Sequence, residues 1–239
     1  MHRYLFRFFT QLFVFAAFSG GLALAQKVDT EDASRQRFKM LEAAETGDLS
    51  AINRLIVVGT KVDVTDESLR TPLYMAVEKN RLEAVKLLLA EGASVNAQAR
   101  DLDTPWLLAG ALGRADILRL MIPHAPNMAI RNRFGGTALI PACEKGHVEA
   151  VRVLLDTAID LDHINNLGWT CLIEIAYLSD GGPRVQDIAR MVLQAGANPN
   201  IADKRGKTAL AHAESRKLTA LAAILRAHGA TTTAATRGK

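Results

Sequence analysis

The sequence predicts an all-α solenoid of stacked repeats, and three observations support this prediction. A threonine recurs every 33 residues and each time opens a short apolar run, at Thr71, Thr104, Thr137 and Thr170. Apolar stretches such as Leu87–Leu89 and Val153–Leu155 have the pattern of second helices that only a neighbouring unit can cover. Glycine follows these helices at one phase, at Gly59, Gly92, Gly196 and Gly229. Stacked proteins of this kind usually bind other macromolecules along an extended concave surface.

The period divides the chain into six units. We expect them at residues of about 38–70, 71–103, 104–136, 137–169, 170–207 and 208–229. The fifth unit is longer than the others, and the first has Phe38 in place of the opening threonine. Residues 26–37 are expected to form a polar lead-in, and residues 230–239, rich in Thr and Ala, a flexible tail.

Three segments carry a family resemblance. Thr71–Ala76 reads T-P-L-Y-M-A, which differs from the ankyrin helix-opening motif only at Tyr74, where the motif has His. Gly146–Leu155 matches the second-helix signature, and Gly92–Ala97 matches the run into the β-turn. The chain therefore resembles ankyrin repeat proteins. The resemblance implies six stacked units of helix–turn–helix plus β-hairpin finger, in an elongated and curved solenoid that binds a partner protein.

The first 25 residues have the features of a secretory signal peptide. Arg3 and Arg7 give a positive start, residues 8–18 are mostly apolar, and Ala23–Ala25 is a cleavage motif. The apolar stretch is too short to span a bilayer well, so an uncleaved anchor is the less favoured alternative. We expect cleavage after Ala25 and a periplasmic location in a Gram-negative bacterium.

The two cysteines, Cys143 and Cys171, lie in successive units. Cys143 occupies a small buried position of a first helix, and Cys171 follows the opening Thr170. These sequence positions do not indicate that the two Cβ atoms meet, as a disulfide requires. We therefore favour buried free thiols, with a disulfide as the alternative.

Several positions depart from the repeat pattern. Ala125 and Ala158 stand where other units have glycine, so a left-handed backbone there would cost about 1 kcal/mol, and Ala158→Gly is expected to raise the melting temperature. Pro141 falls in the first turn of a first helix, where its missing N–H is tolerated. Residues 179–184 of the fifth unit widen the turn between its helices, and Pro183 is expected to open the second helix.

The segment 179–184 has two interpretations, a tolerated surface insertion or a specificity loop at one end of the groove. Together with residues 163–169 it is similar to exported bacterial ankyrin proteins. The resemblance therefore extends to the exported, periplasmic type.

Composition and motifs argue against catalysis and against nucleic-acid binding. The formal charge of +4 falls to +2 without Arg3 and Arg7, a balance typical of a solvated surface. The histidines fall at different phases, and no His-x-x-x-His or Cys-x-x-Cys spacing suggests zinc. G-x-S-x-G, P-loop and G-x-G-x-x-G motifs are absent from the sequence. We expect no enzymatic activity, no cofactor, no metal and no nucleic-acid partner.

The repeat phase also indicates which side chains point away from the core. The middle units carry large apolar groups at these positions, and such groups are typical of binding hot spots. The candidate partner-binding residues are Leu112, Arg133, Phe134, Asn166, Trp169, Glu174, Tyr177 and Leu178. Trp169 and Tyr177 have a second interpretation, in which they pack on each other. Glu174 is expected to be a solvated carboxylate facing the groove, and Trp106 takes a core position.

The sequence therefore predicts a monomeric, periplasmic protein–protein interaction scaffold that binds through its fingers and concave groove, without membrane contact after cleavage. The alternative is an immunity protein that neutralises a toxin acting in the periplasm, which the balanced charge does not support. A cell-wall hydrolase is disfavoured by the missing catalytic motifs. A membrane-surface role would depend on a basic set, Arg131, Arg133, Lys204 and Arg205.

Overall fold

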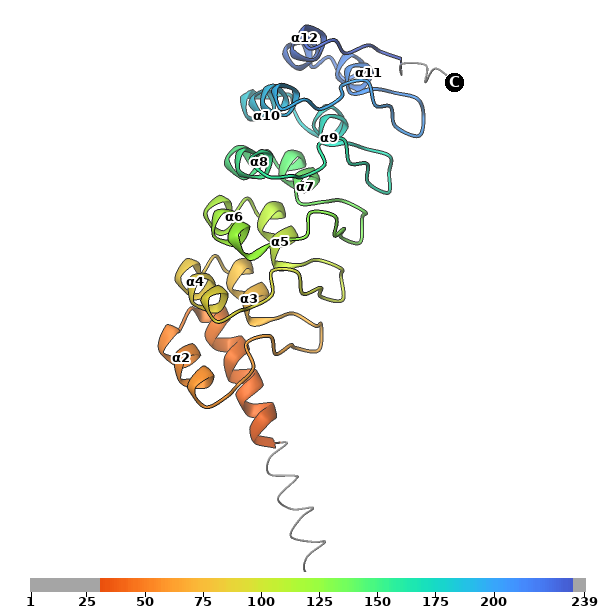
Figure 1. Cartoon of the computed structure of the whole chain (residues 1–239). Helices are drawn as coiled ribbons and strands as arrows, with labels where there is room; N and C mark the ends of the chain where they lie inside the picture. Colours follow the sequence, from red (N-terminus) through yellow and green to blue (C-terminus); the bar gives the residue numbers. More distant parts are fainter. Residues whose placement is uncertain (1–30, 234–239) are drawn as a thin grey trace, which may run out of the picture.

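The computed structural model describes residues 31–233, which form a curved stack of paired helices with loops projecting to one side (Figure 1). The predicted signal peptide, residues 26–30 of the lead-in and residues 234–239 of the tail lie outside the described residues. In the part of the chain that the structure describes, no helix is both long enough and apolar enough to cross a membrane.

The first unit starts earlier than the sequence predicts. Its first helix, α1, is described over residues 31–46, and α2 (Leu49–Val57) packs beside it. The helix therefore includes residues 31–37, which we had assigned to a polar lead-in. Polar residues continue a helix readily once its buried face, here Met40, Leu41 and Ala44, is packed against the next unit.

The first helices of the later units follow the recurring threonines. They are α3 (Pro72–Glu78), α5 (Pro105–Ala111), α7 (Leu139–Glu144), α9 (Cys171–Leu178) and α11 (Ala209–Ser215). In all but α7 the threonine is the N-cap, and its Oγ1 accepts a hydrogen bond from the N–H three residues later, for example from Tyr74 to Thr71 at 3.2 Å. This cap explains why threonine recurs, since few other residues accept this bond. Pro141 lies in the first turn of α7, as predicted.

The second helices form the other layer of the stack. After α2 they are α4 (Leu82–Ala90), α6 (Ala115–Met121), α8 (Val148–Leu155), α10 (Pro183–Gln194) and α12 (Thr219–Ala227), with a short 3-10 helix, η1 (Ile122–His124), after α6. Each contacts the second helix of the next unit, so the apolar core runs continuously along the stack. Trp106 is 1% exposed within this core, as predicted.

The fingers that join one unit to the next are turns, without a named strand among the described residues. In four of them an Asp or Asn side chain accepts hydrogen bonds from two N–H groups further along the loop. These residues are Asp66, Asn132, Asn165 and Asp203. The side chains replace part of the expected hairpin ladder, because they satisfy the same backbone donors.

The fifth unit accommodates its extra residues mainly in a longer helix. Pro183 opens α10, as predicted, and α10 has 12 residues where α4 and α12 have 9. The turn before it is tied to the last unit, since Arg216 donates a 2.5 Å hydrogen bond to the carbonyl oxygen of Ser179. The extra residues therefore lengthen α10, and the turn before it is held against the last unit.

The two alanines in glycine positions differ from each other. Ala125 has the left-handed backbone that the pattern predicts, with φ of 52°. The prediction for Ala158 is wrong, because its φ is not positive. There the N–H and Oγ1 of Thr157 both donate to the carbonyl oxygen of Leu154, at 3.1 and 2.6 Å, so α8 ends in a different turn.

The last described residues are exposed but are tied to the stack by hydrogen bonds. Thr208 Oγ1 donates a 2.6 Å hydrogen bond to the carbonyl oxygen of Thr231, and Lys207 forms a β-bridge with Thr233. Residues 230–233, which we had placed in a flexible tail, therefore continue the end of the stack. The remaining tail residues lie outside the described part.

The two cysteines form a disulfide, so our preference for free thiols is wrong. Cys143 and Cys171 have Cα atoms 5.5 Å apart and are 0% and 1% exposed. The reason is the stagger between neighbouring first helices, which brings the sixth residue after one threonine onto the first residue after the next. The same stagger places Gly110 against Ala138 one unit earlier. The position of a residue within its repeat does not specify this stagger, so the sequence did not indicate that the two Cβ atoms meet.

Candidate functional site

A cavity of about 420 Å³ opens on the concave side of the stack, where two neighbouring fingers meet the first helices α7 and α9. We call it the groove cavity. The fingers contribute Asn132, Phe134, Asn165, Asn166, Leu167 and Trp169 to its lining. The helices contribute Ile140, Pro141, Glu144, Glu174 and Leu178.

The walls of the groove cavity are apolar and partly open to solvent. Phe134 is 60% exposed, Leu167 58% and Leu178 47%. The backbone that carries Phe134 and Leu167 is held by the finger asparagines, since Asn132 Oδ1 accepts from the Phe134 N–H at 3.0 Å and Asn165 Oδ1 from the Leu167 N–H at 2.9 Å. Apolar side chains on a fixed backbone form a preorganised contact surface.

Glu174 lies at the floor of the groove cavity, and our expectation of a solvated carboxylate is wrong. Its side chain is buried, with 4% of the residue exposed, and Oε1 accepts a 2.7 Å hydrogen bond from Asn165 Nδ2. Burial raises the pKa of Glu174 to about 7, the negative charge of Glu144 adds to this increase, and the bond from Asn165 opposes it. The position of Glu174 in its first helix predicted that the side chain faces the groove. Its burial could not be predicted in this way, because it depends on the fingers that cover it.

Aromatic rings lie beside the groove cavity, in the direction of the last unit. The rings of Trp169 and Tyr177 have centroids 4.6 Å apart, and Tyr177 meets the His212 ring edge-on at 5.2 Å. This arrangement agrees with the interpretation in which Trp169 and Tyr177 pack on each other. Trp169 also lines a second cavity of about 250 Å³, together with Tyr177, Asn166 and Lys204. The same residues therefore pack together and face a cavity.

The sequence did not reveal a buried histidine–carboxyl pair in the last unit. His212 Nε2 lies 2.9 Å from Asp203 Oδ2, and the two side chains are 5% and 4% exposed. Burial acts against ionisation of Asp203, but hydrogen bonds from the Lys207 N–H and from His212 hold its pKa below the usual range. Asp203 and His212 are nine residues apart, as are Asn165 and Glu174, and this shared spacing is the signal that could have revealed both pairs.

The predicted site residues are brought together with two exceptions. Phe134, Asn166, Trp169, Glu174 and Leu178 all line the groove cavity, and Tyr177 lines the second cavity with Trp169.

Arg133 and Leu112 fall outside this lining. The guanidinium carbon of Arg133 lies 4.8 Å from the centroid of the Phe134 ring, at the edge of the site. Leu112 is half-buried against the core and lines neither cavity. The sequence analysis also left out Ile140, Pro141, Glu144 and Leu167 as binding residues.

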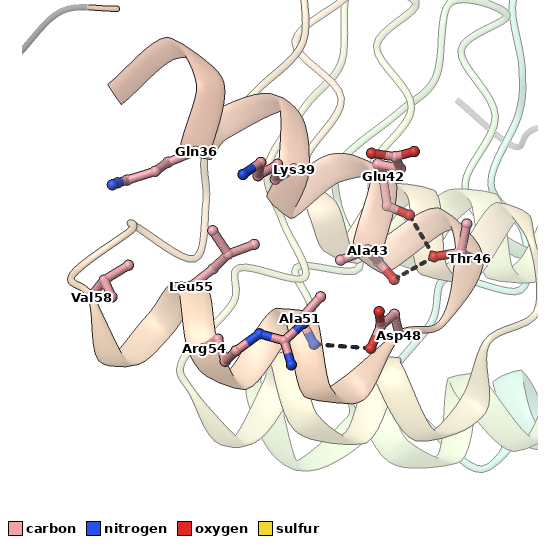
Figure 2. A pocket seen from close by; sticks show the side chains of 10 residues that line it. All are labelled: Gln36, Lys39, Glu42, Ala43, Thr46, Asp48, Ala51, Arg54, Leu55 and Val58. Carbon is pink, nitrogen blue, oxygen red and sulfur yellow. Dashed lines mark hydrogen bonds between the residues drawn. The ribbon is translucent and has the colours of Figure 1, made fainter. Parts of the chain in front are cut away.

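A larger hollow of about 610 Å³ lies at the opposite end of the stack, on the outer face of the first unit (Figure 2). Two of its polar side chains are engaged near helix ends, since Asp48 Oδ1 accepts from the Ala51 N–H and Thr46 Oγ1 donates to the Glu42 carbonyl oxygen, each at 2.9 Å (Figure 2). The hollow therefore lacks the convergent apolar walls of the groove cavity. Across residues 31–233, no group of three or more His, Cys, Asp or Glu side chains is placed to hold a metal ion.

Comparison with known proteins supports the repeat assignment. A family model described as ankyrin repeats in three copies matches residues 40–131 and again 106–203. The ankyrin repeat protein YahD of Escherichia coli K12 is 41% identical over 58 residues, which are 24% of this chain. The aligned part spans only 29% of the length of YahD.

Solved structures match over most of the described stack. An ankyrin repeat domain from Acinetobacter baumannii AYE has a TM-score of 0.78 and 41% identity, with 81% of this chain and 99% of that one covered. The ankyrin repeat protein EF0377 has a TM-score of 0.76 and 39% identity, with 79% and 96% covered. The ankyrin repeat domain of Bcl-3, a member of the IkappaB family, has a TM-score of 0.73 and 29% identity, with 81% and 86% covered.

Proposed function

Because the chain belongs to the ankyrin repeat family, whose domains generally mediate protein–protein interaction, we propose that it is a binding scaffold that docks a partner protein in the groove cavity. The observation that carries this proposal is the gathering of exposed apolar side chains, Phe134, Leu167 and Leu178, around one concave opening. Large apolar groups are normally buried, so a group of them in a preformed hollow is typical of an interaction site.

The packing of the site also favours binding over a purely structural role. Trp169 and Tyr177 support each other, which fixes both rings without closing the cavities beside them. Rigid aromatic rings lose little conformational entropy when a partner covers them, so they are effective anchors. The groove acts by holding a partner in place, and it does not require a catalytic group.

We further propose that the protein works in the periplasm after removal of residues 1–25. The charged and apolar pattern of that segment supports export. The Cys143–Cys171 disulfide also supports it, because disulfides persist in oxidising compartments and are rare in the cytosol of mesophiles. Cell fractionation followed by N-terminal sequencing tests this proposal: we expect a soluble periplasmic chain that begins at Gln26, and a cytosolic or membrane-bound chain that keeps Met1 contradicts it.

Photo-crosslinking in the cell tests the binding site. A photoreactive phenylalanine analogue at Phe134 is expected to capture one dominant protein. The same analogue at Val57, which is 85% exposed on α2 at the other end of the stack, serves as the matched control. The captured band is expected to disappear in a Leu178→Asp background. Equal capture from both positions, or none from Phe134, refutes the proposed site.

A further inference from the structure

The groove cavity combines apolar walls with two carboxyl groups. Phe134, Leu167 and Leu178 stand at its sides, while Glu174 and Glu144 line it from neighbouring first helices. Within residues 31–233, the hydrogen bond from Asn165 is the only one made to the Glu174 side chain, and it engages Oε1. The second carboxyl oxygen is therefore available to a group that enters the cavity.

Glu174 is unusual in its structural column. The equivalent residues of α3, α5 and α7 are Met75, Leu108 and Pro141, which bring no charge. In α11 the equivalent His212 has Asp203 as an internal ionisable partner. Among the described residues, the partner of the Glu174 carboxyl is the neutral amide of Asn165, although a buried carboxyl is stabilised far more by a cation. The fold thus supports a carboxyl at this position without providing a counter-charge for it.

Two lysines near the cavity are hydrogen-bonded to backbone carbonyl oxygens. Lys145 Nζ donates a 3.1 Å hydrogen bond to the carbonyl oxygen of Ala111, and Lys204 Nζ donates to that of Asn166. Arg133 lies over the Phe134 ring and does not line the cavity. Among residues 31–233, no salt bridge reaches Glu144 or Glu174, so the floor leaves room for a cation brought by a bound group.

Resting on the proposed function, we propose that the groove cavity receives an arginine side chain of the partner protein. The apolar stem of that side chain contacts Leu167 and Leu178, and its guanidinium reaches Glu174 and Glu144. Arginine fits better than lysine, because a planar guanidinium stacks on aromatic rings and donates to two carboxyl groups at once. The contact of Arg133 with Phe134 shows that this ring already accepts a guanidinium on one side.

Three matched peptides test the proposal on the intact mature protein. They are acetyl-Ala-Leu-Arg-Leu-Ala-amide and the versions with citrulline or lysine in place of arginine. Citrulline has nearly the same shape as arginine and no charge. Titration is followed by the NMR signal of the Trp169 indole N–H, with the core Trp106 as an internal reference. We expect the arginine peptide to shift the Trp169 signal in a saturable way. The citrulline peptide is expected to bind at least tenfold more weakly, and the lysine peptide is also expected to bind more weakly.

The variant Glu174→Gln keeps the acceptor for Asn165 and removes the charge. It is therefore expected to weaken binding of the arginine peptide at least fivefold. Glu149→Gln, an exposed position on α8, is the matched control and is expected to bind as the unchanged protein does. Circular dichroism of both variants verifies folding. The proposal is overturned if the citrulline or the lysine peptide binds as tightly as the arginine peptide. It is also overturned if Glu174→Gln binds the arginine peptide as the unchanged protein does, or if no peptide gives a saturable shift.

The outcome remains separate from that of the proposed function. If the partner is captured at Phe134 and the capture is lost in the Leu178→Asp background, the scaffold function stands. If Glu174→Gln then leaves that capture unchanged, the arginine assignment alone is refuted.

Discussion

Asn165 Nδ2 donates a 2.7 Å hydrogen bond to Glu174 Oε1, and this bond joins a finger of the solenoid to the helix that follows it. The Oδ1 of the same asparagine accepts from the N–H groups of Leu167 and Trp169, at 2.9 and 3.0 Å. One side chain therefore fixes the loop that carries the apolar wall and the carboxyl that forms the floor. Asp203 and His212 repeat this link in the next unit, with an ionisable pair in place of the amide and carboxyl.

The raised pKa of Glu174 predicts a pH-dependent stability. The ordinary value is 4.5 and the folded value about 7, so between these pH values the folded chain holds a proton that the unfolded chain has released. Stability therefore falls as the pH rises through this window, by on the order of 3 kcal/mol. Glu174→Gln is expected to match the unchanged protein near pH 4.5 and to unfold at a higher denaturant concentration at pH 8.

Denaturant unfolding of both proteins at several pH values checks this expectation. Burial also raises the pKa of Asp103 to about 6, and the charge of Asp101 adds to the shift, so part of the pH dependence remains in Glu174→Gln. The difference between the two proteins isolates Glu174. Parallel pH profiles would show that Glu174 ionises in the fold as readily as in the unfolded chain.

Loss of the disulfide is expected to destabilise the middle of the stack. The bond joins residues 28 apart in sequence, and a loop of this length contributes about 3 kcal/mol by restricting the unfolded chain. Chemical unfolding with and without a reductant measures the effect. The double variant Cys143→Ala, Cys171→Ala is the control, since it should unfold at the same denaturant concentration in both conditions.

The two alanines in glycine positions are expected to respond in opposite ways to glycine. Ala125→Gly relieves a left-handed alanine and should stabilise the protein by about 0.5–1 kcal/mol. Ala158→Gly only adds freedom to the unfolded chain, because the φ of Ala158 is not positive, so the melting temperature should fall. Thermal melts of the two variants measure both changes in melting temperature. A higher melting temperature for Ala158→Gly would contradict the turn that ends α8 in the structure.

Gly110 tests the stagger between first helices. A Cβ at this position would lie 2.7 Å from the Ala138 carbonyl oxygen, which belongs to the backbone and cannot move aside cheaply. Gly110→Ala is expected to destabilise the fold by about 1–3 kcal/mol. Gly136→Ala is the control, since its Cβ would meet its nearest neighbour at an ordinary 3.5 Å. Equal melting temperatures for the two variants would mean that the helices separate easily.

The repeat could be predicted from the amino-acid sequence, because its evidence is local. Thr71 caps its own helix, Pro183 opens its own helix, and Trp106 occupies a core position that any stacking of this period buries. The phase also placed Phe134, Trp169 and Leu178 on one side of the stack, and the structure gathers all three around one cavity. These features depend on residues within one unit or on strict repetition of the period.

Features that depend on how one unit lies on the next could not be predicted in this way and follow from the packing of the folded chain. The stagger of α7 and α9 brought Cys143 to Cys171, and the cover provided by the fingers turned Glu174 from an expected solvated carboxylate into a buried one. Leu112 has the right phase and still lies away from the cavities, because its side chain packs against the core. A period specifies which positions are equivalent, whereas the offset and tilt between units follow from side-chain packing across the interface.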